Sequence, residues 1–132
     1  MRILVLQHIS CESPGIYEDI LVEKGASIHR VEIDEGQQLP DWRGFDAIIA
    51  MGGPMSVNDD AILPWLTAEK RWVREAVLAG QPYWGVCLGV QLLAPRLAAQ
   101  PMTTPSFPHF LVSFSPFSGM GKRLTCPMAR SF

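Results

Sequence analysis

Acidic residues are missing from the C-terminal part of this 132-residue chain. All 13 Asp and Glu residues lie at or before Glu75. Residues 1–94 carry these 13 acids against seven Lys and Arg, a net charge of −6, whereas residues 95–132 carry four Lys and Arg and no acid, a net charge of +4. Four scattered cations do not make the clustered basic patch of a nucleic-acid-binding domain. The charge distribution therefore argues against nucleic acid as a partner.

Long apolar runs and patterned cysteines are also absent. No apolar run approaches the roughly 20 residues that cross a bilayer, and the chain passes from Arg2 into a strand-like run without a cleavage signal. The three cysteines, Cys11, Cys87 and Cys126, have the spacing of neither a disulfide framework nor a zinc site. His8 and Cys11 resemble a pair of metal ligands, but no second pair accompanies them, which favours an ordinary loop. We expect a soluble cytoplasmic protein with no membrane partner and no metal.

Strand-like and helix-like segments alternate along the first two thirds of the chain. The 48% apolar content is enough for a single core in one domain. Strands are predicted at residues 2–6, 27–33, 46–51 and 82–86, and helices at residues 16–24, 64–79 and 88–94. This alternation predicts an α/β fold with a doubly wound parallel sheet. Sites in such sheets lie at the carboxyl ends of the strands.

Proline and glycine mark the ends of the predicted helices. Pro64 suits the first turn of one helix, whereas Gly25 and Gly80 suit the positions just past helix ends. Residues 34–44 are expected to form a surface loop. One apolar face of the first helix is expected to contain Ile16, Ile20 and Leu21. Three tryptophans are expected to pack in the core or against helices: Trp65, Trp72 and Trp84.

This regular pattern ends near Ala94. Pro95 lies where the last helix should continue, and an interior proline costs about 3 kcal/mol because it removes a backbone donor and clashes with the preceding turn. Residues 95–132 contain six of the 11 prolines and five of the six phenylalanines but no periodic segment long enough for a helix. We predict that residues 1–94 are the N-terminal part of a domain. Residues 95–132 are predicted to be an atypical Pro/Ser/Phe-rich tail, disordered or produced by a shift of reading frame.

A nucleophile is predicted at the turn between the last strand and the last helix. The stretch Gly85-Val86-Cys87-Leu88-Gly89 places a cysteine between two glycines, each two residues away. The turn of a nucleophile elbow is sharp, and its glycines let neighbouring backbone pass without Cβ clashes. Unsatisfied N–H groups at the start of the helix favour the thiolate form of Cys87. The backbone N–H of Leu88 is expected to point toward an oxyanion that forms on the attacked carbonyl.

A second backbone donor is predicted from Met51-Gly52-Gly53-Pro54, at the end of the preceding core strand. Two N–H groups aimed at one developing negative charge form an oxyanion hole. Together, the segments FDAIIAMGGPMSVND (45–59) and PYWGVCLGVQLLA (82–94) resemble the class I glutamine amidotransferases, especially the subgroup similar to the amidotransferase half of GMP synthase. The resemblance covers about residues 1–94.

The resemblance implies a flavodoxin-like amidotransferase fold, incomplete at the C-terminus, and a reaction that needs no cofactor. Cys87 would attack the side-chain amide of the substrate glutamine, release ammonia and form a γ-glutamyl thioester, which water hydrolyses to glutamate. Gly53 and Leu88 would supply the oxyanion donors, and Gly52 and Gln91 would contact the bound glutamine. A separate synthase subunit would be the partner that accepts the ammonia.

The family also uses a His that transfers the proton and a Glu two residues further on, both from the C-terminal third. His109 is the only His after Cys87, and Leu111 stands where the carboxylate is required. His109 is therefore more readily a tail residue than a base. Because a thiol without a base stays mainly protonated, the resemblance implies slow or absent turnover.

Two other interpretations stay open. The chain could be an inactive truncated product or pseudoenzyme that at most binds a partner through an exposed sheet edge. It could also be a γ-glutamyl peptidase-like hydrolase that uses the same elbow. A shift of reading frame is tested by translating the DNA in the two other frames. The idea fails if neither frame beyond codon 94 gives a His-x-Glu in a family-like context.

Overall fold

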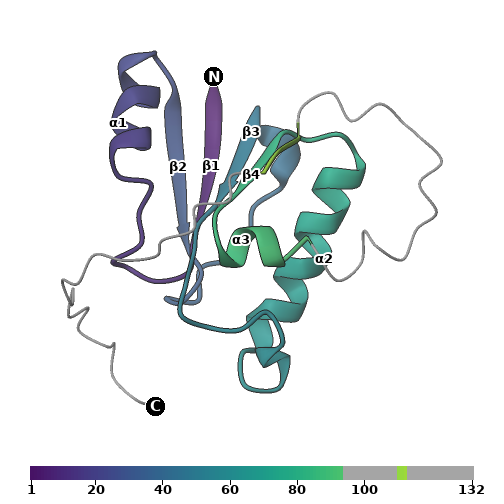
Figure 1. Cartoon of the computed structure of the whole chain (residues 1–132). Helices are drawn as coiled ribbons and strands as arrows, with labels where there is room; N and C mark the ends of the chain where they lie inside the picture. Colours follow the sequence, from purple (N-terminus) through teal and green to yellow (C-terminus); the bar gives the residue numbers. More distant parts are fainter. Residues whose placement is uncertain (94–109, 113–132) are drawn as a thin grey trace.

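The structure is a computed structural model that describes residues 1–93 and 110–112 (Figure 1). The rest of the tail predicted at residues 95–132, His109 included, lies outside the described residues. The elements are, in chain order, β1 (Arg2–Gln7), α1 (Ile16–Glu23), β2 (Ser27–Glu32), the short 3-10 helix η1 (Trp42–Gly44), β3 (Ala47–Ala50), the 3-10 helix η2 (Asp59–Ala61), α2 (Pro64–Leu78), β4 (Tyr83–Gly85), α3 (Leu88–Gln91) and β5 (Phe110–Val112).

The five strands form one parallel sheet in the order β2-β1-β3-β4-β5. This is the strand order of a flavodoxin-like doubly wound sheet, in which the chain winds first to one side of β1 and then to the other. The predicted α/β class and parallel sheet are confirmed, and β1 to β4 agree with the predicted strands within one residue at each end. β5 was not predicted, because three residues are too few to show a period.

Helices cover both faces of the sheet (Figure 1). On β1, Ile3 and Val5 belong to one buried cluster, against which Leu21 of α1 packs. Leu4 and Leu6, which alternate with them, belong to a second cluster that includes residues of α2. Because successive side chains of a strand point to opposite faces, α1 covers one face of the sheet and α2 covers the other.

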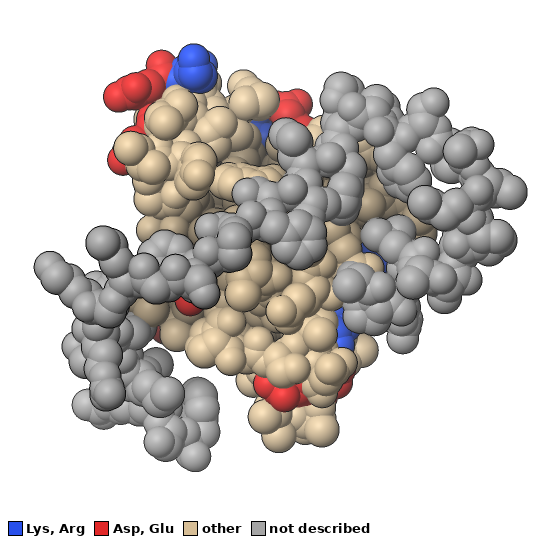
Figure 2. Space-filling model, in the orientation of Figure 1, with Lys and Arg blue, Asp and Glu red and all other residues tan. Residues whose placement is uncertain are grey.

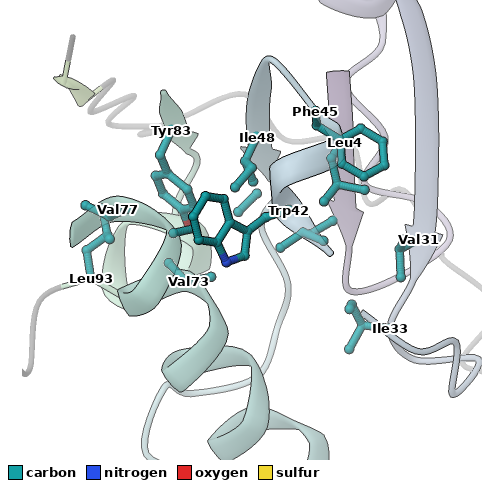
Figure 3. Packing of buried hydrophobic residues seen from close by; sticks show 13 residues of the cluster. Leu4, Val31, Ile33, Trp42, Phe45, Ile48, Val73, Val77, Tyr83 and Leu93 are labelled. Atoms are coloured by element: carbon teal, nitrogen blue, oxygen red, sulfur yellow. The ribbon is translucent and has the colours of Figure 1, made fainter. Parts of the chain in front are cut away.

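The larger cluster lies between the sheet and α2 (Figure 3). Trp42 of η1 is 9% exposed, and its indole lies among Ile48, Val73 and Tyr83 (Figure 3). The surface loop predicted at residues 34–44 is therefore wrong at its end, which contributes a large core side chain. Three further tryptophans are partly buried and pack against the two clusters, as predicted: Trp65, Trp72 and Trp84.

The predicted apolar face of α1 is mostly exposed. None of the residues of α1 is buried, and Ile16 and Ile20 are 69% and 42% exposed. Only Leu21 of the predicted face packs against the core. The helical period identifies side chains that share a face, but the distance of that face from the sheet depends on the chain around it.

The ends of α1 and α2 follow the predicted signals, whereas α3 ends at Gln91, three residues before the predicted end at residue 94. Pro64 is the first residue of α2, where the missing N–H of proline costs nothing. Gly25 and Gly80 follow α1 and α2 with φ angles of 82° and 85°. Their N–H groups donate to the carbonyls of Val22 and Val77 at 2.8 and 3.0 Å, which satisfies carbonyls at the two helix ends.

On the face shown in Figure 2, most of the visible charged side chains lie toward the rim, and most of the described residues visible between them are uncharged. The described residues of this face show no continuous patch of Lys and Arg. Among the described helices, none combines the length and the apolar character that a bilayer crossing requires.

Candidate active site

Cys87 stands between the end of β4 and the start of α3 in a backbone conformation that L-residues rarely adopt. Its φ is 49° and its ψ is −105°, and within the described chain it is the only non-glycine residue with a positive φ. Such conformations cost roughly 1–3 kcal/mol and are concentrated at functional sites. Cys87 is exposed, so this turn presents the residue to solvent rather than to the core.

The glycines on either side of Cys87 allow β3, β4 and α3 to pack in direct contact. A Cβ on Gly85 would lie 2.6 Å from the carbonyl carbon of Gly89, and a Cβ on Gly89 would overlap the carbonyl oxygen of Ala50. The hydroxyl of Tyr83 donates a hydrogen bond of 2.7 Å to the carbonyl of Gly89, which ties β4 to α3. The predicted steric need for both glycines is confirmed.

The Gly52-Gly53 segment follows β3 and lies against this turn. A Cβ on Gly52 would lie 3.4 Å from the Cβ of Cys87, and a Cβ on Gly53 would lie 3.4 Å from the Cδ2 of Leu88. The N–H groups of Gly53 and Leu88 donate no hydrogen bond to another described residue. The carboxylate of Glu12, which the sequence analysis did not single out, also lies beside Gly52. The structure thus brings together the predicted nucleophile and the two predicted donors.

Gln91 lies one helical turn after Cys87. It is the last residue of α3, and its N–H donates to the carbonyl of Cys87 at 3.1 Å. Gln91 is exposed, whereas Gly52 is buried. The contacts with glutamine predicted for Gln91 and Gly52 stay predictions.

A buried ion pair adjoins the Gly52-Gly53 segment. His8 follows β1 and Glu69 lies on α2; both side chains are 0% exposed, and Nε2 of His8 lies 2.8 Å from Oε1 of Glu69. The other ring nitrogen, Nδ1, lies 3.3 Å from the carbonyl oxygen of Gly52. His8 lies in a loop, as expected, but its side chain is bonded on both sides rather than solvated.

The sequence contains a signal for this buried pair that the sequence analysis did not use. Glu69 lies three residues after Leu66 and four residues before Val73, and both of these side chains are fully buried. A carboxylate in the apolar stripe of an amphipathic helix needs a buried partner. His8 comes directly after a strand, at the edge of the sheet where sites form. The two observations together point to a buried polar pair near the site.

Burial and the contacts of Glu69 together shift the pKa values of two neighbouring side chains. Burial disfavours a charged His8, but the hydrogen bond and the charge of Glu69, together with the carbonyls of Gly52 and Met51, raise the His8 pKa above its ordinary value. Burial, and to a smaller extent the charge of Glu69, raise the pKa of Tyr83 well above its usual value. A charged imidazole donates from both nitrogens, which matches the contacts of His8 with Glu69 and Gly52.

The described residues contain no group of three or more His, Cys, Asp and Glu side chains that could hold a metal ion. A cavity of about 540 Å³ is lined by Lys70, Arg74 and Leu93 among others, but Cys87 does not line it. At the turn itself, Cys87 is exposed and lies against the Gly52-Gly53 segment.

A family model of the class I glutamine amidotransferases matches residues 17–121. The match includes the turn at Cys87 and the Gly52-Gly53 segment. This chain belongs to the class I glutamine amidotransferase family. The matched range runs past Ala94, where the resemblance seen in the sequence ended.

Two solved glutamine amidotransferases have a similar fold. The protein from Thermotoga maritima is 29% identical, and the alignment covers 71% of this chain and 41% of that protein with a TM-score of 0.68. The protein from Methylobacillus flagellatus is 36% identical, and the alignment covers 70% of this chain and 37% of that protein with a TM-score of 0.66. The chain thus spans about two fifths of the length of these solved relatives. A comparison with curated proteins gave no match.

Proposed function

We propose that this chain carries the glutamine-attacking part of a glutaminase site, with Cys87 as the nucleophile. The supporting observation is the positive φ of this exposed residue beside the Gly52-Gly53 segment. A strained backbone persists only where the surrounding packing enforces it, as at the turn of a nucleophile elbow. The N–H groups of Gly53 and Leu88 form the oxyanion hole, and Gln91 together with Gly52 contacts the substrate.

The proposed reaction converts glutamine and water into glutamate and ammonia. Sγ of Cys87 bonds to the side-chain amide carbon, and the carbonyl oxygen takes the negative charge into the oxyanion hole. The C–N bond then breaks, and the nitrogen leaves as ammonia with the proton of the thiol. Water adds to the γ-glutamyl thioester, the S–C bond breaks, and the proton returns to sulfur. A synthase subunit would accept the ammonia in the cytoplasm.

Turnover by this chain is proposed to be slow. The proton must travel from sulfur to nitrogen. Neither the His that carries it in the family nor the Glu that orients this His can be assigned here, since His109 precedes Phe110 and Leu111. A positioned base typically contributes 10²–10⁴-fold to such a reaction. Alkylation of Cys87 by a more reactive glutamine analogue depends less on that base, so it is the more sensitive readout.

The experiment uses the full chain and a chloroketone analogue of glutamine. We expect the reagent to modify Cys87, as located by peptide mass spectrometry, and we expect glutamine to slow this labelling by competition. The Cys87→Ala variant should lose the modification and any release of ammonia. Cys11 is also exposed, so the Cys11→Ala variant is the matched control and should keep both.

The same assay separates the alternatives. Amine release from γ-glutamyl peptides without ammonia release from glutamine would replace the glutaminase proposal with a peptidase. Labelling of Cys87 that glutamine does not slow, with no release from either substrate, would identify an inactive member of the family.

A further inference from the structure

The buried pair of His8 and Glu69 calls for a physical explanation. Moving two charges out of water costs several kcal/mol per ion unless their contacts compensate. Oε2 of Glu69 has no hydrogen-bond partner among the described residues, so the compensation is incomplete. The imidazole also stacks on the indole of Trp65, with ring centroids 6.0 Å apart and an interplanar angle of 24°. The ring is thus held by Glu69 on α2 and by the face of Trp65.

The other ring nitrogen faces the backbone that follows β3, where the carbonyls of Gly52 and Met51 both act on the imidazole. Nδ1 of His8 lies 3.3 Å from the carbonyl oxygen of Gly52. That carbonyl and the N–H of Gly53 belong to the same peptide group, and the described chain contains no cis peptide bond. In a planar trans peptide, the C=O and the N–H point in opposite directions. A hydrogen bond that fixes the Gly52 carbonyl toward His8 therefore also fixes the direction of the Gly53 N–H.

We propose that His8 and Glu69 are positioning residues for the oxyanion hole, because the imidazole donates to the Gly52 carbonyl and thereby orients the Gly53 N–H. This inference rests on the proposed function, in which that N–H stabilises the oxyanion. A flexible glycine pair has many accessible backbone conformations, so it needs such a restraint to act as a preorganised donor. Neither His8 nor Glu69 touches the reacting atoms.

Charge strengthens this arrangement. The raised pKa of His8 favours the doubly protonated ring, in which Nε2–H donates to Glu69 and Nδ1–H donates to Gly52. Charge-assisted hydrogen bonds are about twice as strong as neutral ones. Donation to a peptide carbonyl polarises the peptide and makes its N–H a better donor. The ion pair thus acts on the N–H of Gly53 through one peptide group.

The test compares two reagents that differ in their need for an oxyanion hole. With the chloroketone analogue of glutamine, the thiolate first adds to the ketone, so that the S–C bond forms as the C=O π bond breaks and the oxygen carries the negative charge. The sulfur then moves to the adjacent CH₂ as chloride leaves, and the C=O bond forms again to give the stable thioether. Iodoacetamide alkylates the thiol by direct displacement of iodide, and no oxyanion forms. The ratio of the two labelling rates at Cys87 therefore reports the oxyanion hole separately from the reactivity of the thiol.

The variants separate the two ring nitrogens. His8→Gln keeps a donor near the position of Nε2 but removes the one that meets Gly52, and His8→Asn keeps a donor near the position of Nδ1. We expect His8→Gln to lower the rate ratio about tenfold or more, since removal of a donor from an oxyanion hole costs 10²–10³-fold. His8→Asn should recover part of that loss. His29 is exposed on β2, so His29→Gln is the matched control and should keep the wild-type ratio.

Three results would overturn the inference. A folded His8→Gln variant with an unchanged ratio would show that the restraint has no effect on the oxyanion hole. An equal fall of both rates would show a general structural role. If the wild type prefers the chloroketone no more than free cysteine does, the proposed function fails and the inference fails with it. Circular dichroism verifies folding, and if His8→Gln does not fold, Glu69→Gln, which keeps the shape of the partner but removes its charge, must lower the ratio.

Discussion

At the scale of single residues, the proposed oxyanion hole rests on two buried side chains, and burying either of them without the other would cost free energy. Burial of one unpaired charge costs far more than burial of a matched pair. His8 and Glu69 are both 0% exposed and lie 2.8 Å apart. The loss of either partner therefore leaves the other in apolar surroundings without its counter-charge.

Removal of Glu69 tests this dependence. We expect Glu69→Ala to lower the free energy of unfolding by about 3–5 kcal/mol, as is typical when one partner of a buried ion pair is removed. Glu75 lies on the same helix and is exposed, so Glu75→Ala should change the free energy by less than about 0.5 kcal/mol. Urea denaturation followed by circular dichroism measures both values. Equal effects of the two substitutions would contradict the role of the pair.

At the scale of secondary-structure elements, close backbone contacts hold the turn at Cys87 in place. Gly89 of α3 lies directly on the carbonyl of Ala50 at the end of β3, and the hydroxyl of Tyr83 holds the Gly89 carbonyl from β4. Gly85 has no room for a Cβ against the backbone of Gly89. The strained backbone of Cys87 is therefore enforced by contacts between three elements.

Gly89→Ala tests this contact. A methyl group there would overlap the Ala50 carbonyl, so α3 must shift, and we expect a loss of about 1–3 kcal/mol of stability, as for other overpacked sites. A Cβ on Gly44 would meet only Nη1 of Arg2, at 3.8 Å, and Gly44→Ala should therefore be tolerated. Thermal melts of the two variants provide the comparison. Labelling of Cys87 by the chloroketone should slow in Gly89→Ala and not in Gly44→Ala.

At the scale of the whole molecule, the order of the strands brings distant parts of the chain to one edge of the sheet. The ends of β1, β3 and β4 lie side by side in the sheet, and His8, Gly52 and Cys87 follow them. α2 covers one face of this sheet and contributes Glu69. The site therefore forms only when the whole domain folds, and the free energy of unfolding depends on the charges of His8 and Glu69.

The pH dependence of stability follows from the raised pKa of His8. Burial opposes the charged ring, but Glu69 and the carbonyls of Gly52 and Met51 outweigh it, and Tyr83 stays neutral beside Glu69 because its pKa is raised. The folded protein therefore holds the His8 proton more tightly than the unfolded chain does. This stabilisation is complete below the unfolded pKa of about 6.5 and is lost as the pH rises through the folded pKa.

Urea denaturation at a series of pH values measures this dependence. We expect the free energy of unfolding to fall as the pH rises above about 6.5, and we expect a flatter profile for His8→Gln. The control variant His29→Gln should follow the wild-type profile, because His29 is exposed. A fall of the same size in His8→Gln would assign the pH dependence to another group.

The fold was largely predictable because its signals are local. Buried parallel strands appear as short apolar runs between turn residues, and Pro64, Gly25 and Gly80 mark helix ends through their own backbone preferences. The burial of α1 was less predictable, since Ile16 and Ile20 share a face that stays mostly exposed. Trp42 was missed as a core residue because its loop has no period that reveals a buried side chain.

The sequence by itself determined the alternation of strands and helices, the turn at Cys87 and the glycines around it. Each of these depends on residues within a few positions of one another, whose steric and hydrogen-bonding preferences act locally. Only the tertiary structure decided that His8 pairs with Glu69, 61 residues away, and that the same ring meets Gly52. The partners of a buried polar group depend on the order of the strands and on the face that α2 covers, which no local pattern specifies.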